Sequence, residues 1–304
     1  MANRVFYASQ GVAISTGTGV GTTVQGAQSV SVNSNFGLEQ AFQLGRLAIY
    51  NNIVTTPEVT VAVTKALDGL STVYKLATGG GTLVSNANDR CNIRVAIGDD
   101  TSSNLSSASC MKMTGMYLSS VTYTMPVEGN MTEEVNFIGD HKVMSSDVVS
   151  APADSGQVVL RRQHFKTASC SFPAEISGQN ITNVTISADL GRDAMYKLGQ
   201  FAPFHRFVNF PLEVTCEFEV SATGVDGIAV DNYNVTCTGD QFPAEANINI
   251  VLCDPENGND SYSFNLGGKN RLTSVAYAGG DTGGGNATVT YSYTTYNELD
   301  ISGW

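Results

Sequence analysis

The sequence predicts a mainly β protein with two homologous β-sandwich or partial-barrel domains in tandem, and three observations support this fold class. The chain has 304 residues, enough for two domains of ordinary size. Charged residues make up 14% of it and glycine contributes 31 residues, whereas typical soluble domains carry about 25% charged residues and about 7% glycine. This composition suits turn-rich β structure. The third observation is an internal repeat.

The repeat relates positions about 154 residues apart. Residues 37–45 read GLEQAFQLG and residues 191–199 read GRDAMYKLG, so the two segments share an acid, an aromatic residue and a closing Leu-Gly. The separation grows by one or two residues farther along the chain. We therefore predict a tandem duplication, with one domain over residues 1–153 and the other over residues 154–304.

Alternation of apolar and polar residues predicts the strands of each domain. Every second side chain in residues 212–221 is apolar, and residues 59–64 show a weaker version of the same pattern. A period of two places one set of side chains on a buried face and the other set on an exposed face. Residues 121–137 and 275–293 predict long hairpins, the second closed by the glycine-rich run at 279–286.

Each domain is also expected to contain one short helix. In both domains a predicted strand leads directly into the repeated Gly-acid-aromatic-Leu-Gly segment. Asn35 and Asp189 precede these segments at equivalent positions. We predict that they are N-caps, because their side-chain oxygens can accept hydrogen bonds from the first backbone N–H groups of a helix.

The sequence does not predict an enzyme. A catalytic site needs particular side chains in convergent geometry, yet His141, His164 and His205 have no histidine at the equivalent position of the other domain. They also lack the HxH or HExxH spacing that is typical of metal ligands. The glycine-rich segment 17–26 lacks the strand, helix and later acid of a nucleotide-binding turn. We therefore expect no catalytic residues, no cofactor and no metal.

Cysteine spacing and hydropathy predict a soluble chain made in the cytosol. The six cysteines form no CxxC pair, so free thiols are expected. No stretch approaches the ~18 to 20 apolar residues of a membrane span, and the N-terminus has a poor signal-peptide core.

The net charge of −12 is unevenly distributed. Lys and Arg number 8 against 11 Asp and Glu in residues 1–150, and 8 against 17 in residues 151–304, which gives −3 and −9. Affinity for nucleic acid comes largely from Lys and Arg that displace counterions from phosphates. An acidic protein of this kind is therefore disfavoured as a DNA clamp or repressor.

Three extended segments of the chain resemble tail tube proteins of tailed bacteriophages. They are residues 37–69 (GLEQAFQLGRLAIYNNIVTTPEVTVAVTKALDG), residues 190–222 (LGRDAMYKLGQFAPFHRFVNFPLEVTCEFEVSA) and residues 267–293 (GGKNRLTSVAYAGGDTGGGNATVTYSY). The resemblance extends over most of the chain, from Met1 to about Asp300. The resemblance rests on these three sequence segments and not on a catalytic motif.

The resemblance implies a structural virion protein. Members of that family form rings that stack into a hollow tube, and hairpins of neighbouring subunits join one inner β-barrel that conducts double-stranded DNA. The implied partners are further copies of the chain, a tape measure protein, tube-terminating proteins and DNA that passes without specific binding. No membrane insertion is implied. The implied location is the virion tail, assembled in the host cytoplasm.

Several alternatives remain open at this stage. A duplicated chain predicts a trimeric, pseudo-sixfold ring, with a homohexamer as the alternative. A contractile sheath around the tube is compatible with the sequence. The alternative functions are a tube subunit of a contractile injection system, which has a similar fold, and a secreted or surface carbohydrate-binding β-sandwich.

Acidic residues on two predicted strands are the candidates for the channel lining. DNA carries one negative charge per ~1.7 Å of its axis, so an acidic wall would let it slide where a basic wall would hold it. The alternative is that the same acids solvate the outer wall of the tube. The candidates are Glu213, Glu217, Glu219, Glu133 and Glu134.

Overall fold

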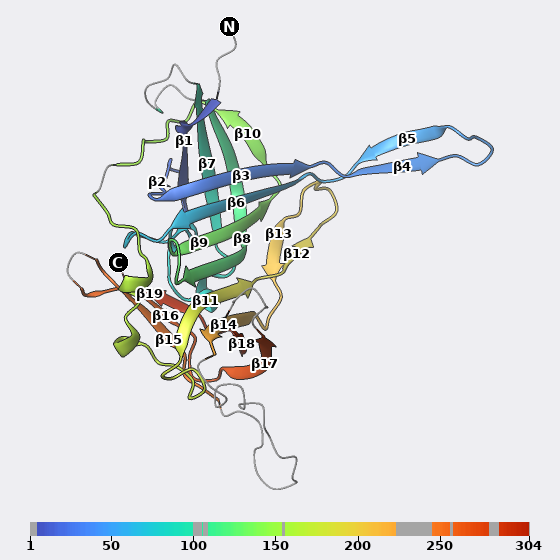
Figure 1. Cartoon of the computed structure of the whole chain (residues 1–304). Helices are drawn as coiled ribbons and strands as arrows, with labels where there is room; N and C mark the ends of the chain where they lie inside the picture. The colour runs from blue at the N-terminus through green and yellow to red at the C-terminus, as the bar shows by residue number, and fades with distance from the viewer. Residues whose placement is uncertain are drawn as a thin grey trace.

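The computed structural model describes residues 5–99, 105, 109–153, 156–222, 245–255, 258–279 and 286–303. The fold is mainly β, as predicted, and its strands pair antiparallel (Figure 1). The strands of the largest sheet follow an open path, so within one chain no described sheet closes into a barrel.

One continuous run of eight strands crosses both halves of the chain. The first half supplies β3 (Ala27–Asn35), β6 (Glu58–Ala66), β9 (Thr132–Gly139) and β8 (Ser109–Pro126), in that spatial order. The second half supplies β11 (Asn180–Asp189), β14 (Glu213–Ser221), β18 (Thr288–Tyr296) and β17 (Arg271–Ala278). We call this run the main sheet.

Two further layers cover one face of the main sheet. The N-terminal part of β8 leaves the main sheet to pair with β7 (Arg90–Asp99) and β10 (Lys142–Ser145), and β7 continues to β1 (Val5–Ser15) and β2 (Thr22–Thr23). Figure 1 shows β1 and β7 crossing behind β3 and β6. In the second half a separate sheet contains β15 (Asn249–Cys253), β16 (Asp260–Asn265) and β19 (Asp300–Ser302).

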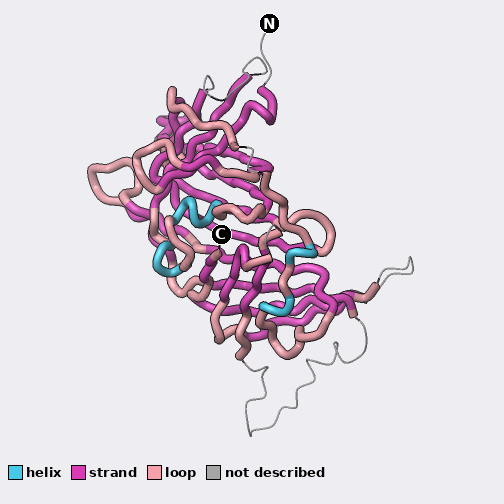
Figure 2. Tube along the Cα trace, turned by 90° about the vertical axis from the view of Figure 1, so that its left-hand side faces the viewer, coloured by secondary structure: helices cyan, strands magenta, loops and turns pink. Residues whose placement is uncertain are grey.

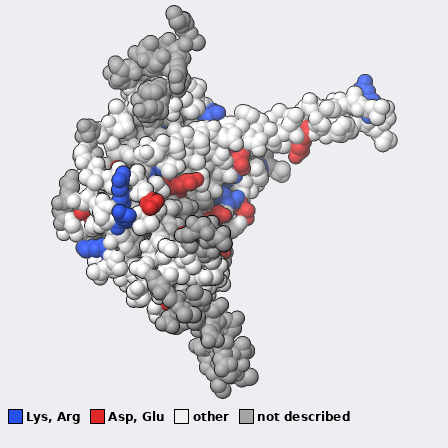
Figure 3. All heavy atoms as spheres, viewed as in Figure 1, with Lys and Arg blue, Asp and Glu red and all other residues white. Residues whose placement is uncertain are grey.

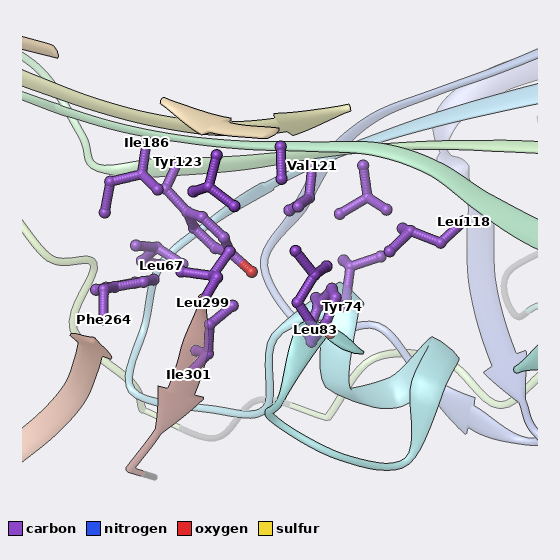
Figure 4. Packing of buried hydrophobic residues seen from close by; sticks show 14 of the residues in the cluster. Leu67, Tyr74, Leu83, Leu118, Val121, Tyr123, Ile186, Phe264, Leu299 and Ile301 are labelled. Carbon is purple, nitrogen blue, oxygen red and sulfur yellow. The ribbon is translucent and has the colours of Figure 1, made fainter. Parts of the chain in front are cut away.

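Apolar side chains fill the space between these layers. Alternate residues of the main sheet point into one hydrophobic core, as the period-two pattern predicts. In Figure 4, Tyr123 of β8 points from the main sheet toward Leu67, Leu299 and Ile301. Its ring centroid lies 4.7 Å from that of Phe264 on β16, so the small sheet packs directly on the main sheet.

The two halves pair their strands in the same register. Val30 pairs with Val63 between β3 and β6, and their counterparts Val184 and Phe218 pair between β11 and β14. The irregularities recur as well. The β8–β9 register shifts between Leu118 and Ser120, and the β17–β18 register shifts between Leu272 and Ser274, 154 residues later. The repeat therefore extends to individual residue pairs, and the boundary at residue 153 stays a prediction.

Hydrogen bonding between β8 and β11 joins the two halves. The register runs from Ser120 opposite Asp189 to Pro126 opposite Asn183. We call this contact the seam. In the spatial order of the sheet, β8 ends the run of first-half strands and β11 begins the run of second-half strands. The seam joins these two, so β3 and β17 remain at the two edges of the main sheet.

The predicted helices after Asn35 and Asp189 are wrong. Both segments form hairpins instead, β4 (Leu38–Phe42) with β5 (Ile49–Val54) and β12 (Arg192–Met195) with β13 (His205–Val208). The Leu-Gly that ends each repeated segment lies in the hairpin loop, where Gly45 and Gly199 both adopt a φ of 84°, a left-handed conformation that favours glycine. A turn of this kind ends a strand and reverses the chain.

The observed helices lie elsewhere. Over the described residues, the α-helices are α1 (Val73–Thr78) and α2 (Leu83–Asn86), and short 3₁₀ turns lie at Arg162–His164 and Thr167–Ser169. In Figure 2 these helical segments lie in front of the strands, on the side of the molecule opposite the β4–β5 hairpin of Figure 1. The predicted long hairpins, β8–β9 and β17–β18, are confirmed, although residues 280–285 of the second turn lie outside the described part.

Candidate functional site: the assembly surfaces

The face of the main sheet that points away from the core is polar. Cross-strand partners on this face are mostly small hydroxyl and amide residues, such as Thr122 opposite Ser187 and Ser187 opposite Thr215. Ser187 and Thr215 also share a side-chain hydrogen bond of 2.6 Å. Where the eight strands pair with one another, Arg271 at one edge is the single cation among the described residues that point outward. Lys112 lies on the part of β8 that leaves the main sheet and forms an ion pair with Asp147. We call this surface the polar face.

Four of the five predicted acids lie on the polar face. Glu213 and Glu217 on β14 are exposed and Glu219 is half-buried, whereas Glu134 is exposed on β9. Glu134 lies opposite Thr122 of β8, and Glu217 lies opposite Thr185 of β11. The seam strands therefore separate two groups of carboxylates. Whether this face lines a channel stays a prediction.

Glu133 cannot line a channel. Its side chain is 0% exposed and points into the core of the first half, so this candidate is wrong. Its carboxylate accepts hydrogen bonds from the backbone N–H groups of Val73 and Tyr74 at 2.6 and 2.9 Å, and from the Tyr123 hydroxyl at 2.8 Å. The residue therefore holds the first turn of α1 against the sheet.

Buried charge surrounds Glu133. Lys65 lies opposite it in the β6–β9 pairing, is equally buried and forms a 2.8 Å ion pair with Asp68. Burial raises the pKa of Glu133, and the N–H groups of Tyr74 and Val73, the Tyr123 hydroxyl and the charge of Lys65 oppose that shift. Lys65, Asp68 and Glu133 are all buried, so the cluster holds β6, β9 and α1 together.

The two edges of the main sheet carry unpaired strands. The outward positions of β3 and β17 are exposed, and Tyr277 of β17 is 55% exposed on the core side of the sheet. Its counterpart in the first half, Tyr123, is 0% exposed, because its strand pairs with β11 at the seam, opposite Ile186, and its ring packs on Phe264. Unpaired edge strands template pairing with another chain unless they are covered. The edges are therefore the first candidate assembly surface.

The β12–β13 hairpin packs across the seam onto the first half. Arg192 donates from Nε to the carbonyl oxygen of Leu118 at 2.7 Å and forms a second bond to the carbonyl oxygen of Ala87. Arg206 forms an ion pair with Asp140. These contacts bury charged side chains of the hairpin, which is why Arg206 is only 5% exposed.

His205 is the centre of the same contact. Its Nδ1 lies 2.7 Å from the Tyr117 hydroxyl and 2.7 Å from Nη2 of Arg90. The Arg90 guanidinium also lies over the Tyr117 ring, 5.2 Å from the centroid. Burial, together with the charges of Arg90 and Arg192, lowers the pKa of His205, so the neutral imidazole is favoured. The histidine therefore joins the β12–β13 hairpin to the first half of the chain.

The β4–β5 hairpin extends away from the body (Figure 1). Large apolar side chains are exposed along its length and at its tip, namely Phe36, Leu38, Phe42, Leu44, Leu47, Ile49, Tyr50, Ile53 and Val54. Residues 36–57 contain only Glu39 and Arg46 as charged residues, and the hairpin is otherwise white in Figure 3. An exposed apolar surface of this extent marks an interaction site. In the sequence, this surface corresponds to the many apolar residues in 36–54. The prediction of a helix assigned these residues to helix packing and therefore missed an exposed surface.

The described residues offer little for catalysis or metal binding. They contain no group of three or more His, Cys, Asp or Glu side chains placed to hold a metal ion. Cys91, Cys110, Cys216 and Cys253 are free thiols, and burial raises the pKa of the Cys91 thiol to about 12, which disfavours its thiolate. Cys237 lies outside the described residues.

Comparison with known proteins adds no relative. No protein-family model matches the chain, and no curated protein matches its sequence significantly. Among the described residues, no helix has the length and apolar character needed to cross a bilayer.

Proposed function

We propose that this chain is a structural subunit that joins further copies of itself edge to edge, forming rings that stack into the tail tube of a tailed bacteriophage. The assignment to a tail tube is supported by the resemblance of three sequence segments to tail tube proteins. The edge-to-edge assembly is supported by the structure, and one observation carries it. Within one chain, the seam pairs two strands whose counterparts in the other half are the free edge strands.

The counterparts of the seam strands are the free edges. β17 is the counterpart of β8, and β3 is the counterpart of β11. Each seam residue can be replaced by its counterpart 154 residues away in the other half. The pair Asp189–Ser120 then becomes Asn35 of one chain opposite Ser274 of the next, and Ser31 likewise lies opposite Ala278. The same shift places Val32 opposite Tyr277, as Ile186 lies opposite Tyr123. Pairing in this register would bury the exposed ring of Tyr277.

Repetition of this contact closes a ring. Three chains with eight main-sheet strands each would give a barrel of ~24 strands, and strands ~4.8 Å apart then set a backbone diameter of at least ~37 Å. Barrels of 16 to 18 strands already leave an aqueous channel. A trimer therefore provides an open lumen, in agreement with the predicted pseudo-sixfold ring.

The polar face is the surface that would face this lumen. The opposite face of the main sheet is covered by layers of the same chain, so closure around the lumen leaves the polar face on the inside. Its side chains are mainly hydroxyls, amides and carboxylates. Such a lining has few cations to bind phosphate and would let DNA pass.

Purified protein tests the assembly directly. We expect rings or tubes in negative-stain electron micrographs, and three chains per ring by native mass spectrometry. Tyr277→Lys should block assembly because it places a charge in the edge contact, whereas Val84→Lys, on the exposed side of α2, should not. A protein that stays monomeric at high concentration, or that binds glycans as a monomer, would overturn the proposal.

Charge reversal tests the lining. Replacing Glu213, Glu217 and Glu219 by Lys should slow DNA ejection from assembled particles while tubes still form. The matched Gln variant removes the negative charge without adding a cation and should have a smaller effect. Unchanged ejection kinetics in the Lys variant would remove these residues from the lumen.

A further inference from the structure

The two hairpins are equivalent in register and differ in environment. Leu38 pairs with Val54 in β4–β5, and Arg192 pairs with Val208 in β12–β13, 154 residues later. Val208 is 7% exposed because its hairpin packs on the first half, whereas Val54 is 56% exposed. The chain therefore contains one hairpin with a partner surface and one equivalent hairpin whose apolar side chains remain in solvent.

The partner surface itself also has an equivalent. In the first half, Arg90 and Tyr117 lie together and hold His205 of the packed hairpin. The equivalent positions in the second half are Glu245 and Arg271. These two side chains also lie together, with a 3.1 Å ion pair, and both are exposed. No described residue of the chain occupies this second surface as His205 occupies the first.

We propose that the β4–β5 hairpin of one chain packs on the Glu245–Arg271 surface of a second copy, in the orientation that β12–β13 adopts on the first half. This inference rests on the proposed self-assembly and adds a second contact to the edge pairing. Asn51 is the equivalent of His205 and would lie between Glu245 and Arg271. Its amide nitrogen can donate to the carboxylate, and its amide oxygen can accept from the guanidinium.

The changes on the two sides match each other. The packed hairpin places Arg206 against Asp140, whereas the equivalents are Asn52 on β5 and Tyr296 on β18, so the cation and its acid are both replaced. Arg192 is replaced by Leu38, whose counterpart surface includes half-buried Leu272. A contact held by charge in one position is predicted to be held by apolar packing in the other.

Only a second copy brings the two surfaces together. The β4–β5 hairpin leaves the main sheet at the β3 edge, and Arg271 lies at the β17 edge. Seven strand spacings of ~4.8 Å place these edges roughly 34 Å apart within one chain. Pairing of β17 with β3 of the next chain removes this separation, just as the seam places β12–β13 beside β8.

Cross-linking between two variants that each carry one introduced cysteine, beside the six native ones, tests the contact. Asn51→Cys and Arg271→Cys chains are mixed before assembly, and the product is treated with a short bis-maleimide reagent. We expect a cross-linked dimer in the mixture that exceeds any dimer formed by either variant or by the unmodified chain through its native cysteines, because only the mixture brings introduced cysteines at residues 51 and 271 of different chains together. The double variant Tyr117→Cys with His205→Cys is the matched control, and its cross-link should form within one chain.

The outcomes separate this inference from the proposed function. Tubes that form in the mixture without the dimer would overturn the hairpin contact and leave edge assembly intact. Failure of the unmodified chain to form rings would reject the proposed function first. Either cysteine substitution could abolish assembly that the unmodified chain completes. In that case, assembly of the conservative variants Asn51→Gln and Arg271→Lys supports the contact. Loss of assembly in those variants as well contradicts the assigned polar geometry.

Discussion

At one equivalent position of the core, the first half of the chain has a pair of charged residues on neighbouring strands and the second half has a pair of valines. In the first half, Lys65 of β6 lies opposite Glu133 of β9. In the second half, the equivalent pair is Val220 of β14 opposite Val289 of β18. All four side chains are buried. A duplicated fold can therefore keep its strand register while one copy replaces an apolar pair by a charged one.

The difference shows what a buried charge needs. Glu133 is tolerated because three donors reach its carboxylate, and two of them are backbone groups of α1. Lys65 is held by Asp68 and by the carbonyl oxygen of Ser71 at 3.2 Å. The valine pair needs none of these partners. The charged pair therefore links the sheet to α1 and its preceding loop, whereas the valine pair contributes packing alone.

The largest expected effect is that of Glu133→Ala. It leaves two backbone N–H groups and the Tyr123 hydroxyl without their acceptor and removes the carboxylate opposite Lys65, whose ammonium keeps its ion pair with Asp68. Loss of a buried charged group with several hydrogen-bond partners costs about 3–5 kcal/mol of unfolding free energy. Val289→Ala removes only apolar contacts and should cost about 1–3 kcal/mol. Urea denaturation of both variants makes the comparison, and equal losses would contradict it.

A double-mutant cycle should show stronger coupling for the charged pair of the first half than for the valine pair of the second half. Lys65→Met with Glu133→Gln should cost less than the two single changes added together, with a coupling of about 0.5–3 kcal/mol. The apolar cycle, Val220→Ala with Val289→Ala, reports the coupling expected from packing. A charged pair that couples no more strongly than the valine pair would show that Lys65 and Glu133 act independently.

The pH dependence of stability should separate the halves further. Burial raises the folded-state pKa of Glu133, so the folded protein binds a proton here more readily than the unfolded chain. This contribution favours folding at acidic pH and is lost as pH rises from the unfolded pKa toward the raised folded value. Glu133→Gln should remove that dependence. Denaturation measured from pH 4 to pH 8 checks the sign, and a change in the opposite direction would contradict it.

Asp147 should give the smallest effect and the opposite sign. Hydrogen bonds from Arg94 and Lys112 lower its pKa to about 2. Its contribution is present above the unfolded value of about 3.9 and is lost as pH falls through about 2. Asp147→Asn should therefore reduce stability slightly at neutral pH and leave it unchanged at the most acidic pH. A loss that grows on acidification would disagree with this assignment.

The sequence predicts the strands better than the helices. The period-two pattern and the repeat identify β14, its counterpart β6 and both long hairpins. The segments after Asn35 and Asp189 are misread because a short apolar pattern does not distinguish helix from strand. The signals for α1 were present, since Thr72 accepts from the backbone N–H of Lys75 and Gly79 has a φ of 74°. A six-residue helix is too short to show a helical period.

The candidate acids illustrate the same limit. Residues 131–137 alternate, so Glu133 shares the core face with Val135 and Phe137, whereas Glu134 shares the polar face with Asn136. Strict alternation therefore distinguishes the two glutamates. The tertiary contacts that stabilise Glu133 come from α1, about 60 residues earlier. Sequence spacing alone does not reveal such a contact. Likewise, only the folded sheet shows that β3 and β17 remain at its edges.

Placing β8 and β11 in one polypeptide has a consequence for how an oligomer would respond to dilution. That junction forms when the chain folds, so its strength does not depend on how many molecules are present. The junction between β17 and β3 of different molecules obeys mass action. Dilution would therefore dissociate a ring into intact eight-strand plates and never into single repeats. Two repeats in one chain would reduce the intermolecular junctions of a six-repeat ring from six to three.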